Sequence, residues 1–371
     1  MRMKKLWMML PFAAMALLFA SCSDDSDSVQ SRHGEGDPIR FSTSIANLTR
    51  NSFVEGNFTE FKVSATGNSA TYFDALSVTK TLVNNVSTWN SATEQLWPGY
   101  ALKFYAWAPA AQTGVSVSST AQTVTDFTPA TAVASQTDLI TAYNTGSMGS
   151  VNLNFKHALS QIEVLATNGK PDEFTVKVLG VKLCRIPSKA TMTFQQSTTA
   201  YPTWGTPTIP ADYILKGTTP VTLTSTAQSI MFGDNCFQLI PQTLTPWNSG
   251  ILADGAYLSI LCQITKVSDS SQLYPDASGK YGFSAVAINT PWIPGHKYIY
   301  TVNFFKGDNG GAGRIDPTPT NPENGDDDTV DPTPGGEGGH GGDPVIGGPI
   351  TFTVSITDWI SEDGDHKDID L

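Results

Sequence analysis

The sequence has few charged residues, few histidines and few cysteines for its length. Charged side chains make up 15% of the 371 residues, and there are only five histidines and four cysteines. No basic cluster stands out, so nucleic acid is not an expected partner. No long segment carries apolar residues at helical spacing, which argues against a helical bundle. What the chain does have is much Ser, Thr, Gly, Asn and Val in its middle, a composition typical of β-rich exported proteins.

The sequence also lacks the patterns that would indicate catalysis, a metal or a cofactor. There is no HExxH, GxSxG, GxGxxG or GxxxxGK[ST] segment, and no pair of cysteines has CxxC spacing. His157 closes a predicted strand and is expected to be structural. The acidic runs at 326–328 and 362–368 do not follow a calcium-binding loop and are expected to be solvated. We therefore predict no enzymatic activity, no bound metal and no cofactor.

Three cysteines of the chain body lie in apolar stretches. They are Cys184, Cys236 and Cys262. Buried thiols are the expected state. One disulfide, from Cys184 or Cys236 to Cys262, is an alternative in an exported protein.

The first residues have the pattern of a bacterial lipoprotein signal. Residues 1–21 give a basic start, an apolar run and small residues before Cys22. This run is too short for a stable membrane span, so we expect cleavage before Cys22 and a lipid, palmitate, on its thiol. An ordinary secretory signal with an incidental cysteine is the alternative. Residues 23–27, within an acidic tether at 22–36, resemble the tag of lipoproteins that reach the outer face of the outer membrane, which predicts a cell-surface location. A plain solvated tether is the alternative.

The net charge of −12 is concentrated at the C-terminal end. Residues 308–371 contain fifteen acidic and two basic side chains, whereas residues 37–307 contain fifteen acidic and sixteen basic ones. Residues 308–349 are rich in Gly, Pro and Asp and have little apolar surface to bury. They are predicted to form a flexible linker.

Alternation of apolar and polar residues with a period of two dominates the rest of the chain. Many strands separated by turn residues favour β-sandwiches, and the length suggests two domains, which we place at 37–155 and 156–371. The predicted strands before the linker are residues 39–45, 61–65, 102–107, 138–143, 150–164, 174–183, 191–194, 221–223, 236–240, 257–265, 281–288 and 297–305.

One more strand is predicted after the linker, at residues 350–359. Its apolar side chains occupy alternate positions, at Ile350, Phe352, Val354 and Ile356. A strand of this kind has to pair with a sheet. It can return to its own sheet beside residues 297–305, or it can enter another subunit.

Several motifs follow one another along the chain: Trp97-Pro-Gly before Leu102-Lys-Phe-Tyr-Ala-Trp107, Asp138-Leu-Ile-Thr-Ala142, Phe155-Lys-His157-Ala-Leu159, Trp292-Ile-Pro-Gly295 and the closing Asp358-Trp359. Taken in this order, they resemble the fimbrillin family, the Mfa-like fimbrial subunits of type V pili. The resemblance implies two transthyretin-like β-sandwich domains and a lipoprotein precursor that builds, caps or anchors surface fimbriae.

The same resemblance implies a route of assembly. In stalk subunits of the family a trypsin-like protease cuts after an Arg and frees the first strand, and a strand from the next subunit fills the groove. Here Arg50 follows the first predicted strand and is our candidate cut site, with Arg40 and Arg32 as runners-up. The strand of Ile350, Phe352, Val354 and Ile356 is the candidate donor. The long insertion at 308–349 departs from the family pattern.

The leading hypothesis is a structural subunit or accessory adhesin of surface fimbriae. Its expected partners are other fimbrial subunits through strand exchange, the outer membrane through the lipid on Cys22, and a ligand on a host or bacterial surface. The alternative is a surface glycan-binding lipoprotein, in which Trp89, Trp204 and Trp247 stack on sugars.

Overall fold

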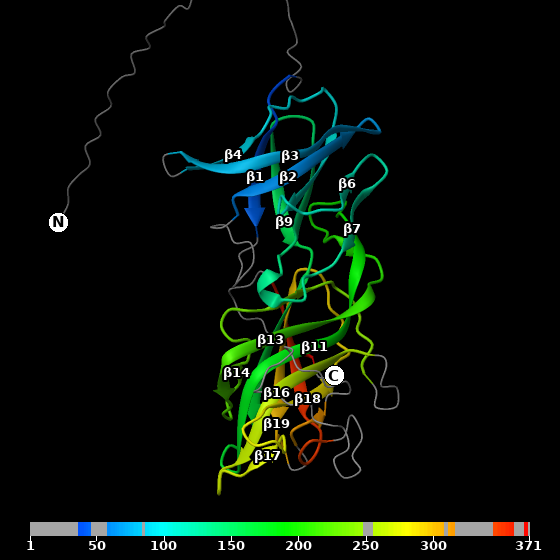
Figure 1. Cartoon of the computed structure of the whole chain (residues 1–371). Helices are drawn as coiled ribbons and strands as arrows, with labels where there is room; N and C mark the ends of the chain where they lie inside the picture. The colour runs from blue at the N-terminus through cyan, green and yellow to red at the C-terminus, as the bar shows by residue number, and fades with distance from the viewer. Residues whose placement is uncertain are drawn as a thin grey trace, which may run out of the picture. The chain divides into compact units, whose positions relative to one another are not determined.

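The described part of the polypeptide is built almost entirely from β-strands. The computed structural model in Figure 1 describes residues 36–45, 58–83, 86–247, 255–307, 311–315, 344–359 and 367–369. Within these residues the only helix is a short 3-10 turn, η1 (Val133–Ser135). The prediction of an all-β protein is therefore confirmed. The predicted signal 1–21, Cys22, Arg32, Arg50 and most of the predicted linker lie outside the described residues.

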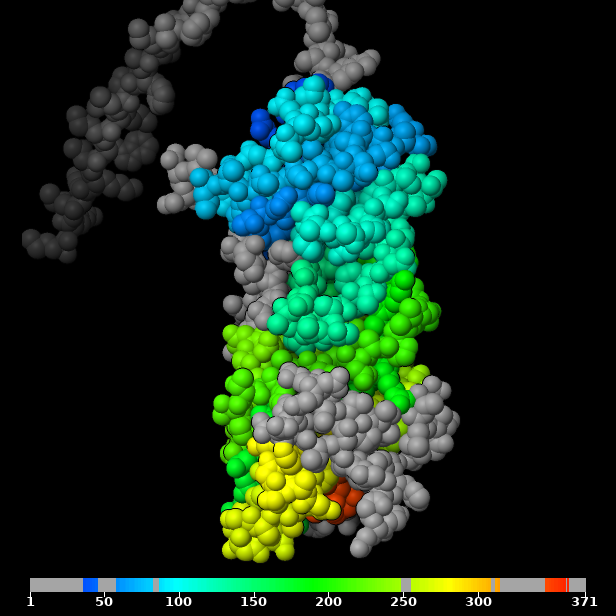
Figure 2. Space-filling view, in the orientation of Figure 1, coloured from blue at the N-terminus to red at the C-terminus, as the bar shows by residue number. Residues whose placement is uncertain are grey.

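The strands of the first region form one sheet that closes on itself. Neighbouring strands are antiparallel, with one parallel exception between the first and last strands of the region. Much of its visible surface comes from the second and third strands, shown in blue in Figure 2. In spatial order the strands are β1 (Arg40–Ile45), β4 (Val86–Ser91), β3 (Ala70–Val83), β2 (Glu60–Gly67), β5 (Leu102–Ala108), β8 (Ile140–Gly146) and β9 (Ser150–His157).

The second region contains two sheets that share one apolar core, the arrangement of a β-sandwich. One sheet has the order β14 (Gln228–Ser229), β10 (Ser160–Asn168), β19 (His296–Phe304), β21 (Thr351–Asp358) and β22 (Lys367–Ile369), with β15 (Phe237–Leu239) also paired to β10. The other has the order β20 (Arg314–Ile315), β18 (Gly282–Ala287), β16 (Tyr257–Lys266), β11 (Phe174–Thr193), β7 (Gln122–Phe127) and β6 (Val115–Val117), with β12 (Thr203–Trp204) and β13 (Thr208–Thr222) paired to β11 and β17 (Gln272–Tyr274) paired to β16.

The period-two pattern of the sequence explains which side chains enter the cores. In β9, Val151, Leu153 and Phe155 are buried, and the two Asn residues between them are exposed. β16 differs, because most of its residues are buried on both faces. Its near-continuous apolar sequence is typical of a strand that is covered on both sides.

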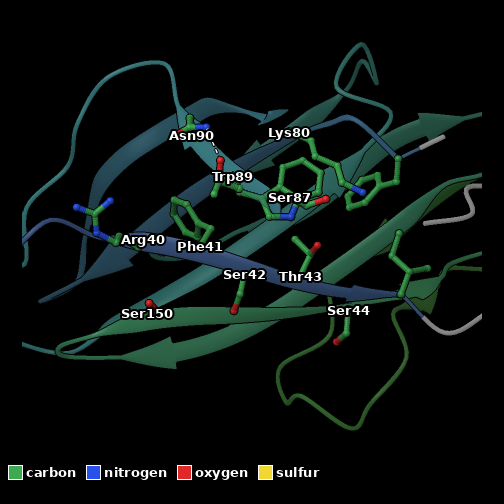
Figure 3. A pocket seen from close by; sticks show the side chains of 13 residues that line it. Arg40, Phe41, Ser42, Thr43, Ser44, Lys80, Ser87, Trp89, Asn90 and Ser150 are labelled. Atoms are coloured by element: carbon green, nitrogen blue, oxygen red, sulfur yellow. Dashed lines mark hydrogen bonds between the residues drawn. The ribbon is translucent and has the colours of Figure 1, made fainter. Parts of the chain in front are cut away.

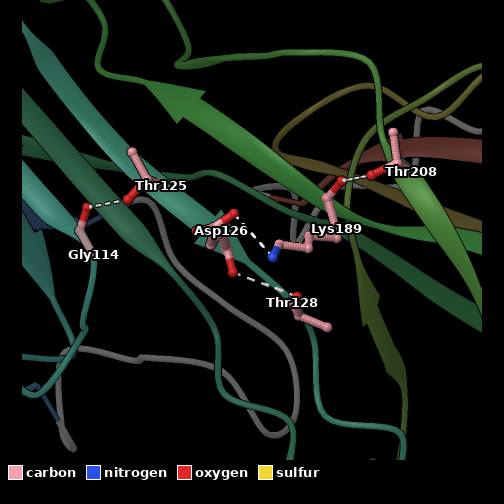
Figure 4. Close-up of polar contacts among 6 residues, drawn as sticks. All are labelled: Gly114, Thr125, Asp126, Thr128, Lys189 and Thr208. Carbon is pink, nitrogen blue, oxygen red and sulfur yellow. Dashed lines mark hydrogen bonds and ion pairs between the residues drawn. The ribbon is translucent and has the colours of Figure 1, made fainter.

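A hairpin from the first half of the chain completes a sheet of the second half. β7 pairs with the last residues of β11, where Met192 lies opposite Val124. The amine of Lys189 on β11 lies 3.0 Å from Asp126 Oδ1 at the end of β7, and Thr125 Oγ1 donates a hydrogen bond to the carbonyl of Gly114 (Figure 4). Residues before and after position 155 therefore share one sheet.

The structure splits one predicted strand and joins two others. The single strand expected at 150–164 is broken at Ala158 and Leu159, whose backbone groups bond to Leu139 and Gly295 and not to a ladder. As a result β9 belongs to the first sheet and β10 to the second region. The strands expected at 174–183 and 191–194 are instead parts of the long β11.

The hairpin of β3 and β4 was missed by the sequence reasoning. A bulge in β3 interrupts its alternation: the pairing shifts between Phe73 and Leu76, and Ala75 has a positive φ of 49°. The buried Ser64 on β2 supports this bulge, because its hydroxyl donates to Asp74 Oδ1 at 2.6 Å and accepts from the backbone N–H of Ala75 at 2.8 Å. A period of two cannot be read across such a shift.

Candidate functional site

The first strand, β1, is held very differently along its two edges. Toward β9 it forms a parallel ladder of six residue pairs, from Arg40 opposite Ser150 to Ile45 opposite Phe155. Toward β4 the structure has a single pairing, Phe41 opposite Trp89. Within β1 this is the one pair on the β4 side. The residues just before β1 are bonded on the same side, because the N–H of Ile39 donates to the carbonyl of Gln95 at 2.7 Å and Pro38 lies opposite Leu96.

β1 and the residue before it nevertheless contribute apolar side chains to the core of the first region. Ile39 and Phe41 are 4% and 7% exposed. The Phe41 ring makes edge-to-face contacts with Phe61 and Phe104, at centroid distances of 6.2 and 6.0 Å. Removal of β1 would therefore uncover an apolar trough as well as the unpaired backbone of its neighbours.

A groove of about 630 Å³ follows from the sparse pairing between β1 and β4 (Figure 3). Polar side chains line much of it: Ser42 and Ser44 on β1, and Ser87 and Asn90 on β4. Trp89 lies at the groove with its ring 5.0 Å from Phe58 and from Phe61. The groove thus separates the edges of β1 and β4 on either side of the Phe41–Trp89 pair.

The candidate cut sites differ in their relation to β1. Arg40 is the first residue of β1, is exposed, and borders the groove. A cut after Arg40 would leave the strand attached to the rest of the chain. Arg50 comes after β1 in the sequence, so a cut there would separate β1 from everything that follows. Of the two, only Arg50 has the position that strand removal requires.

The last strand, β21, lies beside β19 of its own chain. Eight residue pairs form this antiparallel ladder, from Asn303 opposite Thr351 to His296 opposite Asp358. The sequence left open whether this strand returns to its own sheet or enters another subunit. In the structure it returns to its own sheet. The candidate donor residues share one face: Ile350 and Val354 are buried, and Phe352 and Ile356 are partly buried against the same core.

Two tyrosines of β19 are buried beside β21. Burial raises the pKa of Tyr298 to about 12, and burial likewise raises the pKa of Tyr300 above its ordinary value. The Tyr300 hydroxyl accepts a hydrogen bond from Trp292 Nε1 at 3.0 Å, and its ring lies 5.7 Å from that of Phe352. Both phenols are therefore held neutral beneath the last strand.

The tryptophans considered for sugar stacking have structural contacts. Trp247 is 3% exposed in an apolar cluster with Tyr257. Trp204 is partly buried, donates from Nε1 to the carbonyl of Ala158 at 2.7 Å, and has its ring 5.3 Å from that of Phe127. Trp89 borders the groove beside β1, and Trp247 lines a smaller cavity of about 210 Å³ together with Ala285 and Ile350.

The other groups considered for chemistry are also part of the packing. Cys184, Cys236 and Cys262 are buried, and none of them forms a disulfide. Burial raises the pKa of the Cys236 thiol to about 11. Among the described residues, no group of three or more His, Cys, Asp or Glu side chains is close enough to hold a metal ion. No helix within the described segments has the length and apolarity needed to cross a membrane.

The sequence reasoning missed a buried contact between an aspartate and a histidine. His157 Nδ1 lies 2.7 Å from Asp138 Oδ2, and both side chains are 2% exposed. The two residues belong to two separate motifs, so their spacing in the sequence gave no reason to join them. The signal that was present is an Asp and a His in otherwise apolar segments, since a buried charge needs a partner.

The fold is all-β, with β1 at the closure of the first sheet and β21 between β19 and the short β22 in a sheet of the second region. The chain belongs to the fimbrillin-like family, whose family model matches residues 48–317. This match confirms the resemblance found in the sequence. No curated protein is similar enough in sequence to match the chain.

Solved structures that resemble this chain come from Bacteroides and Parabacteroides species. A fimbrial protein from Bacteroides vulgatus is 16% identical, with a TM-score of 0.47, and the match covers 72% of this chain and 94% of that one. A candidate cell adhesion protein from Parabacteroides distasonis is 7% identical, with a TM-score of 0.48, over 88% of this chain and 98% of that one. Another, from Bacteroides uniformis, is 12% identical, with a TM-score of 0.44, over 87% and 98%. The family assignment rests on the family model and not on these structures.

Proposed function

We propose that this chain is a structural subunit or accessory adhesin of surface fimbriae that is joined to its neighbours by β-strand addition. In this scheme a cut after Arg50 releases β1, and a strand from another subunit takes its place. β21, with Ile350, Phe352, Val354 and Ile356 on one face, is the candidate donor. Membership of the fimbrillin-like family supports the fimbrial role.

The observation that carries the proposal is the asymmetric attachment of β1. From Arg40 to Ile45 one edge has a single pairing, at Phe41 and Trp89, and further bonds on that side are made only by the residues before the strand, while Phe41 still fills the core of the sheet. Its apolar side chains contribute on the order of 5–10 kcal/mol by burial, before the cost of ordering them. A replacement strand gains a similar amount, which is enough to hold two subunits together.

The test compares two arginine variants of the full precursor. After treatment with a trypsin-like protease, the wild type is expected to form oligomers on size-exclusion chromatography with light scattering. Arg50→Ala should remain monomeric because β1 stays attached. Arg40→Ala is the matched control and should behave like the wild type. Equal assembly of Arg50→Ala and wild type would show that the cut site is wrong.

Anchoring through Cys22 is a separate part of the proposal. A lipid on this residue would attach the exported chain to the outer membrane and place it at the cell surface. Metabolic labelling with a palmitate analogue should mark the wild type and leave Cys22→Ser unmarked. Labelling of the Cys22→Ser variant to the same extent would contradict lipidation at this position.

Glycan binding is the second candidate function, and the groove beside Trp89 is the surface that favours it. The groove combines an aromatic ring with hydroxyl and amide groups, as sugar sites do. Screening the chain and its Trp89→Ala variant on a glycan panel tests this. Trp204→Ala is the control, because that ring is packed against Phe127. Binding that depends on Trp89 would favour the glycan function.

A further inference from the structure

The residue after β21, Trp359, is anchored apart from the rest of the strand. The apolar side chains of β21 belong to the core of the second region, whereas Trp359 belongs to a different cluster that includes Leu139, Ala158 and Leu159. It is 2% exposed, and its ring stacks on the ring of His157, with centroids 4.0 Å apart and planes 17° from parallel.

The surface that receives Trp359 is built from three distant parts of the chain. His157 closes β9 and is paired with Asp138, which precedes β8. The backbone N–H of Trp359 donates to the carbonyl of Gly295 at 2.9 Å, and the N–H of Gly295 donates to the carbonyl of Leu159 at 2.9 Å. We name this surface, formed by Asp138, His157, Leu159 and Gly295, the tryptophan pocket.

Gly295 is required at its place in the pocket. Its φ of +72° is a conformation that side-chain-bearing residues rarely adopt. A Cβ at this position would also lie 2.2 Å from Tyr201 Cε1. The glycine therefore lets the turn before β19 approach Tyr201 closely while its N–H and carbonyl connect Leu159 to Trp359.

The alternation of β21 cannot fix its own register. A shift of two residues along β19 places one of Ile350, Phe352, Val354 and Ile356 where another had been, so an apolar face still meets the core. Trp359 is out of phase with this series and enters a different cluster. It is the feature of the strand that a two-residue shift would misplace.

We propose that the tryptophan pocket is a binding site for the tryptophan that ends a C-terminal strand, and that it fixes the register of this strand against β19. In this structure the occupant is Trp359 of the same chain. The second occupant, which rests on the proposed strand addition, is Trp359 of a second copy, since a donated β21 has the same sequence. Trp359 Nε1 has no hydrogen-bond acceptor among the described residues, so stacking and burial hold the ring.

Cysteine pairs in the full chain measure the register directly. Thr301 lies opposite Thr353 on the face away from the core, so Thr301→Cys with Thr353→Cys should form a disulfide. Thr301→Cys with Ser355→Cys reports a shift of two residues and should form little. Adding Trp359→Ala should raise the shifted disulfide about fivefold or more relative to the native one, because the pocket no longer favours one register.

Matched variants distinguish the effect of the tryptophan pocket on register from the effect of losing buried apolar surface. Val354→Ala removes buried apolar surface from β21 and leaves Trp359 in place, so the native disulfide should still dominate. His157→Ala keeps the tryptophan and removes the ring on which it stacks, so it should shift the pairing as Trp359→Ala does. An unchanged disulfide pattern in both pocket variants would overturn the register role, and so would an equal shift in Val354→Ala.

Binding of Trp359 from a second copy is tested with peptides, so that the test needs neither proteolysis nor assembly of subunits. Labelled peptides of residues 349–361, with Trp or with Ala at position 359, are titrated into full-length Trp359→Ala protein. The Trp peptide should bind about tenfold more tightly or better, the gain that aromatic burial and stacking provide. His157→Ala in the same background should remove the difference. Equal binding, or no binding of the Trp peptide, would overturn the trans part and leave the Arg50 proposal standing on its own test.

Discussion

The two terminal strands of the described body are attached by different means. β1 has a parallel ladder to β9 and one residue pair to β4, whereas β21 has an antiparallel ladder of eight pairs and a buried tryptophan just beyond its end. Parallel pairing is slightly weaker per residue than antiparallel pairing. The comparison teaches that the first strand is the one whose removal meets less resistance, and that the last strand needs its terminal anchor released before it can leave.

The largest effect is expected at that anchor. Trp359→Ala should lower the free energy of unfolding by about 3–5 kcal/mol, because a fully buried aromatic ring and its contact with His157 are lost. Urea denaturation of the full chain measures this loss. Trp359→Phe retains a stacking ring and should lose less than half as much. A loss below about 1 kcal/mol for the Ala variant would mean that β21 is not held at its end.

A smaller loss is expected in the first strand. Phe41→Ala removes a side chain that is 7% exposed and should cost about 3 kcal/mol, at the low end for a buried phenylalanine because β1 is sparsely paired on one side. Hydrogen exchange should then rise in β1 before it rises in β9. If β9 opens together with β1, the two strands act as one unit and the seam at β4 is not the weak point.

Gly295 offers a finer test of how β21 is anchored. Gly295→Ala should cost about 2 kcal/mol, because it combines a strained φ with a contact to Tyr201. Gly279→Ala is the matched control: its φ is +76°, but a Cβ there meets nothing within 4 Å. This control should cost about 1 kcal/mol. Equal costs in thermal or urea unfolding would show that the close approach to Tyr201 does not matter.

The smallest effect is expected in alkaline titration. Burial raises the pKa of Tyr298, under β21, and of Tyr105, in the first region, to about 12 each. Their protons are therefore kept in the folded state above the pH at which the unfolded chain releases them. Their contribution to stability is complete below pH of about 10 and declines as the pH rises toward 12.

Ultraviolet absorbance of the phenolate distinguishes Tyr298 from Tyr105 in this titration. Trp359→Ala should move the titration of Tyr298 toward neutral pH and leave that of Tyr105 in place, with Tyr298→Phe and Tyr105→Phe assigning the signals. Unchanged titration of Tyr298 would mean that β21 still covers it without its anchor.

Much of the fold could be predicted from the sequence because the signal is local. The alternation in β9, β19 and β21 places apolar residues on one face, and the structure buries those faces. The prediction was incomplete where the alternation breaks, as at the bulge around Ala75. Arg50 and Cys22 stay predictions, since both lie outside the described residues.

By itself, the sequence determined the strand-rich class, the family motifs and the out-of-phase position of Trp359, since composition and periodicity are properties of neighbouring residues. Only the tertiary structure decided that Asp138, His157, Gly295 and Trp359 meet at one pocket and that β1 itself has only one residue pair with β4. The physical reason is that contacts between distant segments depend on sheet order and register. These in turn depend on the packing of the whole core and not on any one segment.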